Sequence, residues 1–114
     1  MNNIARAYNN YDKKQMVEFE IEQLISNERD YAFICDDSLE VLKTIPNETV
    51  NCVITSPPYW NLREYDVAEN SNVIGNEPDY KDYVKNLTAI FNEIKRILTK
   101  DGSLWLNLGD KYHG

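Results

Sequence analysis

Residues 50–60 read Val-Asn-Cys-Val-Ile-Thr-Ser-Pro-Pro-Tyr-Trp, and this stretch decides how the chain is interpreted. Its first part, Val50 to Thr55, is a short apolar run that predicts a buried strand. The second part, Ser56 to Trp60, is stiffened by two prolines, which fix φ and lack an N–H. Because open α/β sheets bind ligands at the carboxyl ends of their parallel strands, this turn is a candidate active site.

Strand and helix signals also precede this stretch. Residues 31–35, Tyr-Ala-Phe-Ile-Cys, predict a strand. Asp37 and Glu40 have the spacing of a capping box, and they predict a helix that stops at Pro46-Asn47. The order strand, helix, strand is that of a βαβ unit. A separate amphipathic helix is predicted over residues 12–27.

A further helix and a third strand are predicted downstream. Glu77-Pro78-Asp79 is a helix entry signal, apolar residues then recur every three or four positions, and Asp101-Gly102 ends the helix. Ser103 to Leu108 predicts the third strand. The alternation favours an α/β domain with three parallel strands and flanking helices. The polar residues 63–76 are expected to form a mobile loop. The basic residues placed on the solvent face and carboxyl end of the helix are Lys95, Arg96 and Lys100.

The composition restricts the class of protein. The 114 residues suffice for one small domain or part of a larger one. A net charge of −7 argues against this segment gripping DNA phosphates by itself, because such affinity comes mostly from Lys and Arg. Cys35 and Cys52 fall in predicted strands without CxxC spacing, and the sequence has only one histidine, so neither a disulfide framework nor a zinc site is supported. Both cysteines are interpreted as buried structural thiols, and no metal is expected. The polar amino terminus has no signal-peptide character, so a cytoplasmic protein is expected.

A series of motifs resembles one enzyme family. In chain order they are Asp36–Leu39, Ser56–Tyr59, Asn61–Tyr65, Ile74–Glu77 and Gly102–Asp110. The series is similar to the amino-terminal part of the β-group DNA amino-methyltransferases, which methylate cytosine N4 or adenine N6 with S-adenosylmethionine. The resemblance covers residues 31–114 and implies an incomplete Rossmann-like methyltransferase fold, with residues 1–30 as an amino-terminal extension. Taken alone, Ser-Pro-Pro-Tyr also occurs by chance and in proline-rich ligands.

The resemblance assigns the chemistry to Ser56, Pro57, Pro58 and Tyr59. An exocyclic amine is a poor nucleophile because its lone pair is delocalised into the ring. The Ser56 hydroxyl and the Pro57 carbonyl are expected to accept its two N–H bonds, which aims the lone pair at the sulfonium methyl group. Tyr59 is expected to stack on the extruded base, and Trp60 is expected to line the same pocket. Serine at the first position and tryptophan after the tyrosine favour cytosine N4, with adenine N6 as the alternative.

Three further residues are candidates by the same resemblance. Asp36 is expected to approach the cofactor, although a solvated helix cap explains it equally well, and Cys35 stands where the family usually has glycine. Asp110 is expected to line the cofactor or target pocket, with the end of a strand as its alternative explanation. Arg63 is expected to contact a substrate phosphate or to order the loop, with simple solvation as its alternative.

The glycine-rich cofactor motif and the target-recognition region of the family are not found in this sequence. We therefore expect a fragment or split subunit of a restriction-modification enzyme, inactive alone and marginally stable as a monomer. Its expected partners are double-stranded DNA and a second chain that supplies the cofactor-binding half. A non-catalytic interaction module is an alternative from another class, and methylation of RNA or a small molecule is a third hypothesis.

Overall fold

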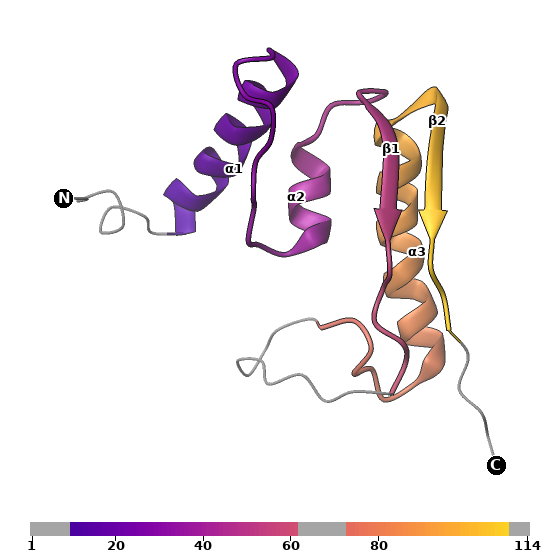
Figure 1. Cartoon of the computed structure of the whole chain (residues 1–114). Helices are drawn as coiled ribbons and strands as arrows, with labels where there is room; N and C mark the ends of the chain where they lie inside the picture. Colours follow the sequence, from indigo (N-terminus) through magenta and orange to yellow (C-terminus); the bar gives the residue numbers. More distant parts are fainter. Residues whose placement is uncertain (1–9, 62–72, 110–114) are drawn as a thin grey trace.

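The computed structural model describes residues 10–61 and 73–109, which form helices beside a two-stranded sheet (Figure 1). The element order is α1 (Asn10–Ile25), α2 (Ser38–Thr44), β1 (Val50–Thr55), α3 (Tyr80–Ile97) and β2 (Leu98–Leu106). The α/β class is thus confirmed. None of the helices in these two ranges is long and apolar enough to cross a membrane.

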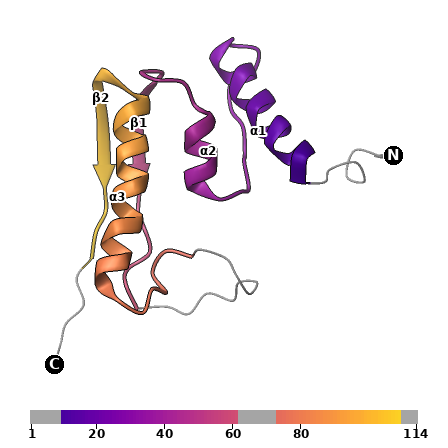
Figure 2. The ribbon, with the colours of Figure 1, turned by 180° about the vertical axis from the view of Figure 1, so that it is seen from behind.

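The two strands pair in parallel, and α3 is the crossover between them. In register, Val53 lies opposite Leu104 and Thr55 opposite Leu106. Figures 1 and 2 show α3 on one face of this sheet. Ile94 and Ile97 of α3 are buried, while Val17 and Ile21 of α1 are buried where α1 packs on α2. The apolar spacing seen in the sequence therefore locates the core correctly.

Helix α2 begins as the sequence predicts, because the Asp37 carboxylate accepts the Glu40 N–H at 3.1 Å. The helix ends before Pro46, since Ile45 adopts the extended conformation (φ −80°, ψ 130°) that a following proline favours. Arg96 of α3 then donates to the carbonyl oxygens of Ile45 and Leu42 at 2.8 and 2.9 Å. Placing Arg96 on the solvent face was wrong, because its guanidinium donates to two carbonyl oxygens at the end of α2, and the Leu42 oxygen also accepts the Ile45 N–H.

The predicted end of α3 at Asp101-Gly102 was also wrong. The helix stops at Ile97, and Leu98 is already extended (φ −66°, ψ 137°). The register then shifts, because Val50 pairs with Leu98 but Cys52 pairs with Ser103. A Cβ at Gly102 would lie 2.9 Å from the Thr99 carbonyl oxygen, so a close backbone approach in this irregular segment explains the glycine.

No strand forms at residues 31–35, contrary to the sequence prediction. The ring of Phe33 is 94% exposed, and its partner in an edge-on ring contact, Tyr31, is also exposed. Figures 1 and 2 show α2 between this segment and β1. A β-prone sequence needs a neighbouring strand to bond to, and within the described residues this segment has none.

Cys35 and Cys52 are free thiols that are exposed, so their interpretation as buried was wrong. Cys35 lies in the unpaired segment. Cys52 lies on β1, where Ile54 is 80% exposed and its register partner Trp105 is 67% exposed. The sheet face turned away from α3 is therefore uncovered in the described part of the chain.

Candidate active site

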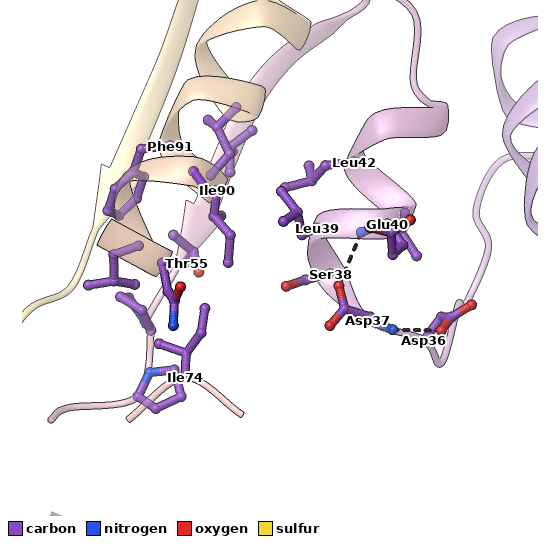
Figure 3. A pocket seen from close by; sticks show the side chains of 18 of the residues that line it. Asp36, Asp37, Ser38, Leu39, Glu40, Leu42, Thr55, Ile74, Ile90 and Phe91 are labelled. Carbon is purple, nitrogen blue, oxygen red and sulfur yellow. Dashed lines mark hydrogen bonds between the residues drawn. The ribbon is translucent and has the colours of Figure 1, made fainter. Parts of the chain in front are cut away.

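An open cleft of about 1130 Å³ separates α2 from the carboxyl end of β1. Figure 3 shows Asp36, Asp37 and Ser38 on one side of the cleft and Thr55, Ile74 and Phe91 on the other. The residues of the predicted motif that line it are Ser56, Pro57 and Pro58, and α3 contributes Ile90 and Ile94. A mostly apolar cleft with a few polar groups at its rim is the usual form of a small-molecule site.

Asp36 lies on the α2 side of the cleft. Its carboxylate accepts the Asp37 N–H at 2.7 Å and forms an ion pair with Lys13 of α1 at 3.3 Å. The backbone hydrogen bond, helped by Lys13, holds the pKa of this carboxyl below its usual value of 3.8. Asp36 is therefore a charged acceptor at neutral pH, with oxygens available to hydroxyl or amine donors of a ligand.

Pro58 is held from α3. The Tyr83 hydroxyl donates to the Pro58 carbonyl oxygen at 2.7 Å, across a sequence separation of 25 residues. Desolvation, followed by the nearby Glu77 and Tyr59, raises the pKa of the Tyr83 phenol above its usual value of 10.0. The hydroxyl thus remains a donor throughout the neutral range.

Glu77 organises the other side of the same turn. Its carboxylate accepts the Gly75 N–H at 2.8 Å and the Asn86 amide at 3.0 Å. Its backbone carbonyl accepts the Trp60 indole N–H at 2.8 Å. The Gly75 carbonyl in turn accepts the Asn61 N–H at 2.8 Å. Residues 75–77, which the sequence analysis assigned to a mobile loop and a helix entry, are thus bonded to the proline turn.

Two glycines make room for the motif. A Cβ at Gly109 would lie 2.6 Å from Cζ of Tyr59, so the tyrosine ring rests directly on this glycine. Gly75 has φ of +107°, and a Cβ there would lie 3.1 Å from the Tyr59 carbonyl oxygen. Gly75 therefore requires glycine because of its positive φ, whereas a side chain at position 109 would have to displace the Tyr59 ring.

The structure brings several predicted site residues together around one cleft and places others beside it. Ser56, Pro57, Pro58 and Asp36 line the cleft, whereas Tyr59 packs on Gly109. The Trp60 ring, half-buried, meets the Tyr80 ring edge-on at 6.2 Å. Arg63 and Asp110 lie outside the described residues. Within the described ranges, no group of three or more His, Cys, Asp or Glu side chains is arranged to hold a metal ion.

Sequence reasoning did not identify Tyr83, Glu77 or Gly109 as parts of the site. Tyr83 was one of the apolar residues that recur along α3. Glu77 was interpreted as part of a helix entry signal and of the Ile74–Glu77 motif, and no role in the site was assigned to it. A hydroxyl-bearing ring at a core-facing position was the available signal for Tyr83, because a buried tyrosine hydroxyl usually has a hydrogen-bond partner.

A stiff turn at the end of a parallel strand, facing an open cleft, is where α/β domains commonly bind their ligands. The comparison with known families then gives the class of enzyme. A family described as DNA methylase, N6_N4_Mtase, matches residues 50–114, more than half of the chain. The chain belongs to this family, the DNA amino-methyltransferases.

Curated relatives include three Type II methyltransferases. M.SfiI of Streptomyces fimbriatus is 47% identical over 83 residues, which are 73% of this chain and 19% of the relative. M.XycI of Xanthomonas campestris pv. cyanopsidis is 51% identical over 76 residues, 67% of this chain and 24% of the relative. M.SmaI of Serratia marcescens is 44% identical over 91 residues, 80% of this chain and 30% of the relative.

The chain thus spans less than a third of the length of each of these curated relatives. No solved structure matches it.

Proposed function

We propose that this chain provides the target-base end of the active site of a DNA methyltransferase that modifies cytosine N4. The observation that supports the proposal is the location of Ser56 and Pro57, which follow β1 directly and line the cleft. The relatives named above are Type II methyltransferases, which supports assignment to a restriction-modification system. Residues 31–114 would then be the amino-terminal part of the catalytic domain, and residues 1–30 an extension of it.

The proposed chemistry begins with the amino group of the target base. The Ser56 hydroxyl and the Pro57 carbonyl accept its two N–H bonds, and this localises the nitrogen lone pair. Transfer would break the sulfur–methyl bond of the sulfonium donor, with its electron pair left on sulfur, and would form the nitrogen–methyl bond from the nitrogen lone pair. The nitrogen would then release one proton to water or a carboxylate and keep its original charge. Tyr59 stacks on the base, which leaves the duplex to enter the pocket. Trp60, bonded to the Glu77 carbonyl, supports the turn from the side.

S-adenosylmethionine supplies the electrophilic methyl group when it is bound. The cleft is consistent with such a ligand, because apolar side chains line most of it and the Asp36 carboxylate stands at its rim. We propose that Asp36 accepts hydrogen bonds from this cofactor and that Asp110 lines the cofactor or target pocket. Contact with a phosphate is proposed for Arg63.

The acidic balance of the chain, net −7, requires that positive charge for holding DNA come from other protein surface. We propose that the remaining part of the methyltransferase, in the same or a second polypeptide, provides that surface and completes the cofactor site. Double-stranded DNA is the proposed substrate.

The test is expression of the coding sequence with its flanking genomic DNA in a host that lacks DNA methylation. Mass spectrometry of the digested host DNA should detect N4-methylcytosine. Ser56→Ala should lower its amount by roughly 10²-fold or more, because one acceptor at the reacting nitrogen is lost. Ser103→Ala, at an exposed serine on β2, should leave it unchanged.

N6-methyladenine in place of N4-methylcytosine would make adenine the target. The absence of any methylated base, with the wild-type protein folded and soluble, would favour a non-catalytic interaction module instead.

A further inference from the structure

The turn at Pro57 and Pro58 lacks the backbone N–H donors that most turns have. Neither proline carries an N–H, so the turn cannot be fixed by backbone donors of these two residues. Hydrogen bonds can hold these two residues only through their carbonyl oxygens. Within the described residues, the hydrogen bonds that hold this turn at Pro58 and Trp60 come from Tyr83 and Glu77, and Glu77 is itself bonded to Gly75 and Asn86.

Tyr83 provides the direct contact. It lies on α3, which is anchored by the buried Ile94 and Ile97 further along the helix. Its hydroxyl therefore reaches the Pro58 carbonyl at 2.7 Å from a fixed position. The peptide that joins Pro58 to Tyr59 is oriented by this bond, and the Pro57 carbonyl and the Tyr59 ring are attached on either side of that peptide.

Glu77 provides the second support. It bonds to Gly75 and to Asn86 of α3 through its carboxylate, and to the Trp60 indole through its backbone carbonyl. Its carboxylate thus links the segment before α3 to α3 itself. The turn is held at Pro58 by one residue and at Trp60 by another, and both depend on α3.

We propose that Tyr83 is a positioning residue for methyl transfer, which acts with Glu77 to hold the proline turn in its productive shape. This inference rests on the proposed function. The Tyr83 hydroxyl donates a hydrogen bond to the Pro58 carbonyl. It thereby sets the direction of the neighbouring Pro57 carbonyl, the acceptor proposed for the target amine. A misplacement on the order of 1 Å at such an acceptor can lower a rate by about 10²-fold.

The first measurement is independent of catalysis. The two tryptophans give two indole N–H resonances, and Trp105 is 67% exposed whereas the Trp60 indole is bonded to Glu77. In Tyr83→Phe, we expect solvent exchange of the Trp60 indole to rise about fivefold or more relative to Trp105. Loss of the Tyr83–Pro58 hydrogen bond should make the turn open more often, and a typical hydrogen bond changes such an equilibrium about fivefold. Tyr80→Phe is the matched control, because it removes a hydroxyl from the same helix and keeps the ring beside Trp60.

The second measurement uses the active methyltransferase from the expression test. Tyr83→Phe should lower kcat about tenfold or more and leave the KM for S-adenosylmethionine unchanged, whereas Tyr80→Phe should change neither. A merely structural loss would lower the amount of folded protein without this division between kcat and KM.

The outcomes separate the two proposals. Unchanged Trp60 exchange in Tyr83→Phe would overturn the positioning role even if the enzyme methylates DNA. Faster exchange with an unchanged kcat would overturn the catalytic consequence and leave the proposed function standing. A folded wild-type protein that methylates nothing would overturn the proposed function and the role in methyl transfer, while the exchange data would still test the support of the turn.

Discussion

Gly109 lies directly against the ring of Tyr59, so that a Cβ at position 109 would be 2.6 Å from the ring carbon Cζ. The two residues follow the two parallel strands, β1 and β2, and they meet where both strands end. Another contact ties β1 and β2 at this level, because the Asn107 N–H donates to the Thr55 carbonyl at 3.0 Å. The Tyr59 ring therefore occupies the space that a side chain at position 109 would need.

Gly109→Ala should move the Tyr59 ring and change the stability of the chain little. The clash involves the far end of a side chain that can rotate, so we expect a change in unfolding free energy of less than about 1 kcal/mol. The proton contacts between the ring and residue 109 should change, as measured by nuclear Overhauser effects. Methylation by the active enzyme should fall because the stacking surface is displaced.

A double-mutant cycle with Tyr59→Ala provides the control for this prediction. Once the ring is absent, Gly109→Ala should have no further effect on methylation, because the two changes act through one contact. Additive effects of the two substitutions would contradict the proposed contact.

Arg96→Gln should destabilise the chain by about 2 kcal/mol. The guanidinium donates to the carbonyls of Leu42 and Ile45 and to the Asn47 side chain, and it pairs with Glu93 at 2.7 Å. Charge-assisted hydrogen bonds to a helix end have this order of worth. Urea unfolding followed by circular dichroism measures the loss.

Lys95→Gln is the matched control for Arg96, since Lys95 is the neighbouring residue and its side chain is exposed. It should change the unfolding free energy by less than about 0.5 kcal/mol. If both substitutions lowered the unfolding free energy equally, the charge of α3 and not the contact of Arg96 with α2 would account for the stabilisation.

The sequence predicted the features that depend on neighbouring residues and missed those that depend on residues far away in the chain. The bounds of β1, the Asp37 cap and the apolar face of α3 depend on neighbouring residues, and all three were predicted. The strand expected at residues 31–35 failed because a strand exists only when another strand pairs with it, and residue patterns do not reveal whether a partner is present.

The supports of the candidate site were missed for a related reason. Tyr83 reaches Pro58 across 25 residues, and Arg96 reaches Leu42 across 54. The sequence of α3 indicates that the Tyr83 hydroxyl needs a partner, but it does not identify the distant residue that Tyr83 or Arg96 contacts. The proline motif was recognisable because its stiffness is a property of the residues themselves, whereas the groups that orient it are defined only by packing.

Ionisation of the Tyr83 phenol should lower the unfolding free energy of the chain in alkaline solution. Its pKa is raised in the folded state, chiefly by desolvation, because the neutral phenol is the form that fits its surroundings. The corresponding stabilisation is complete below the unfolded pKa of about 10 and is lost as pH rises through the folded value. Unfolding by urea at several pH values between about 8 and 11 tests this.

Tyr83→Phe serves as the reference for that titration. The variant lacks the ionisable group, so the difference in stability between wild type and variant should shrink as pH rises above about 10. A difference that stays constant across the range would show that Tyr83 titrates no differently in the folded chain than in the unfolded one.

Lys13→Gln should raise the pKa of the Asp36 carboxyl without returning it to 3.8. The hydrogen bond from the Asp37 N–H is the larger cause of the lowered pKa, and it remains in the variant. A carbon-detected titration of the Asp36 carboxyl measures this shift, with Lys14→Gln as the control because Lys14 faces Glu18 instead.

The ion pair between Lys13 of α1 and Asp36 at the cleft should depend on pH. A carboxyl whose pKa is lowered by folding contributes stability above its unfolded pKa, and the contribution is lost as pH falls through the folded value. The Lys13 share should therefore disappear in acid, below about pH 4, and α1 should then be held less firmly against the residues before α2. An unchanged Asp36 titration in Lys13→Gln would show that α1 exerts no electrostatic influence on the cleft, and that the carboxylate is set by the Asp37 backbone alone.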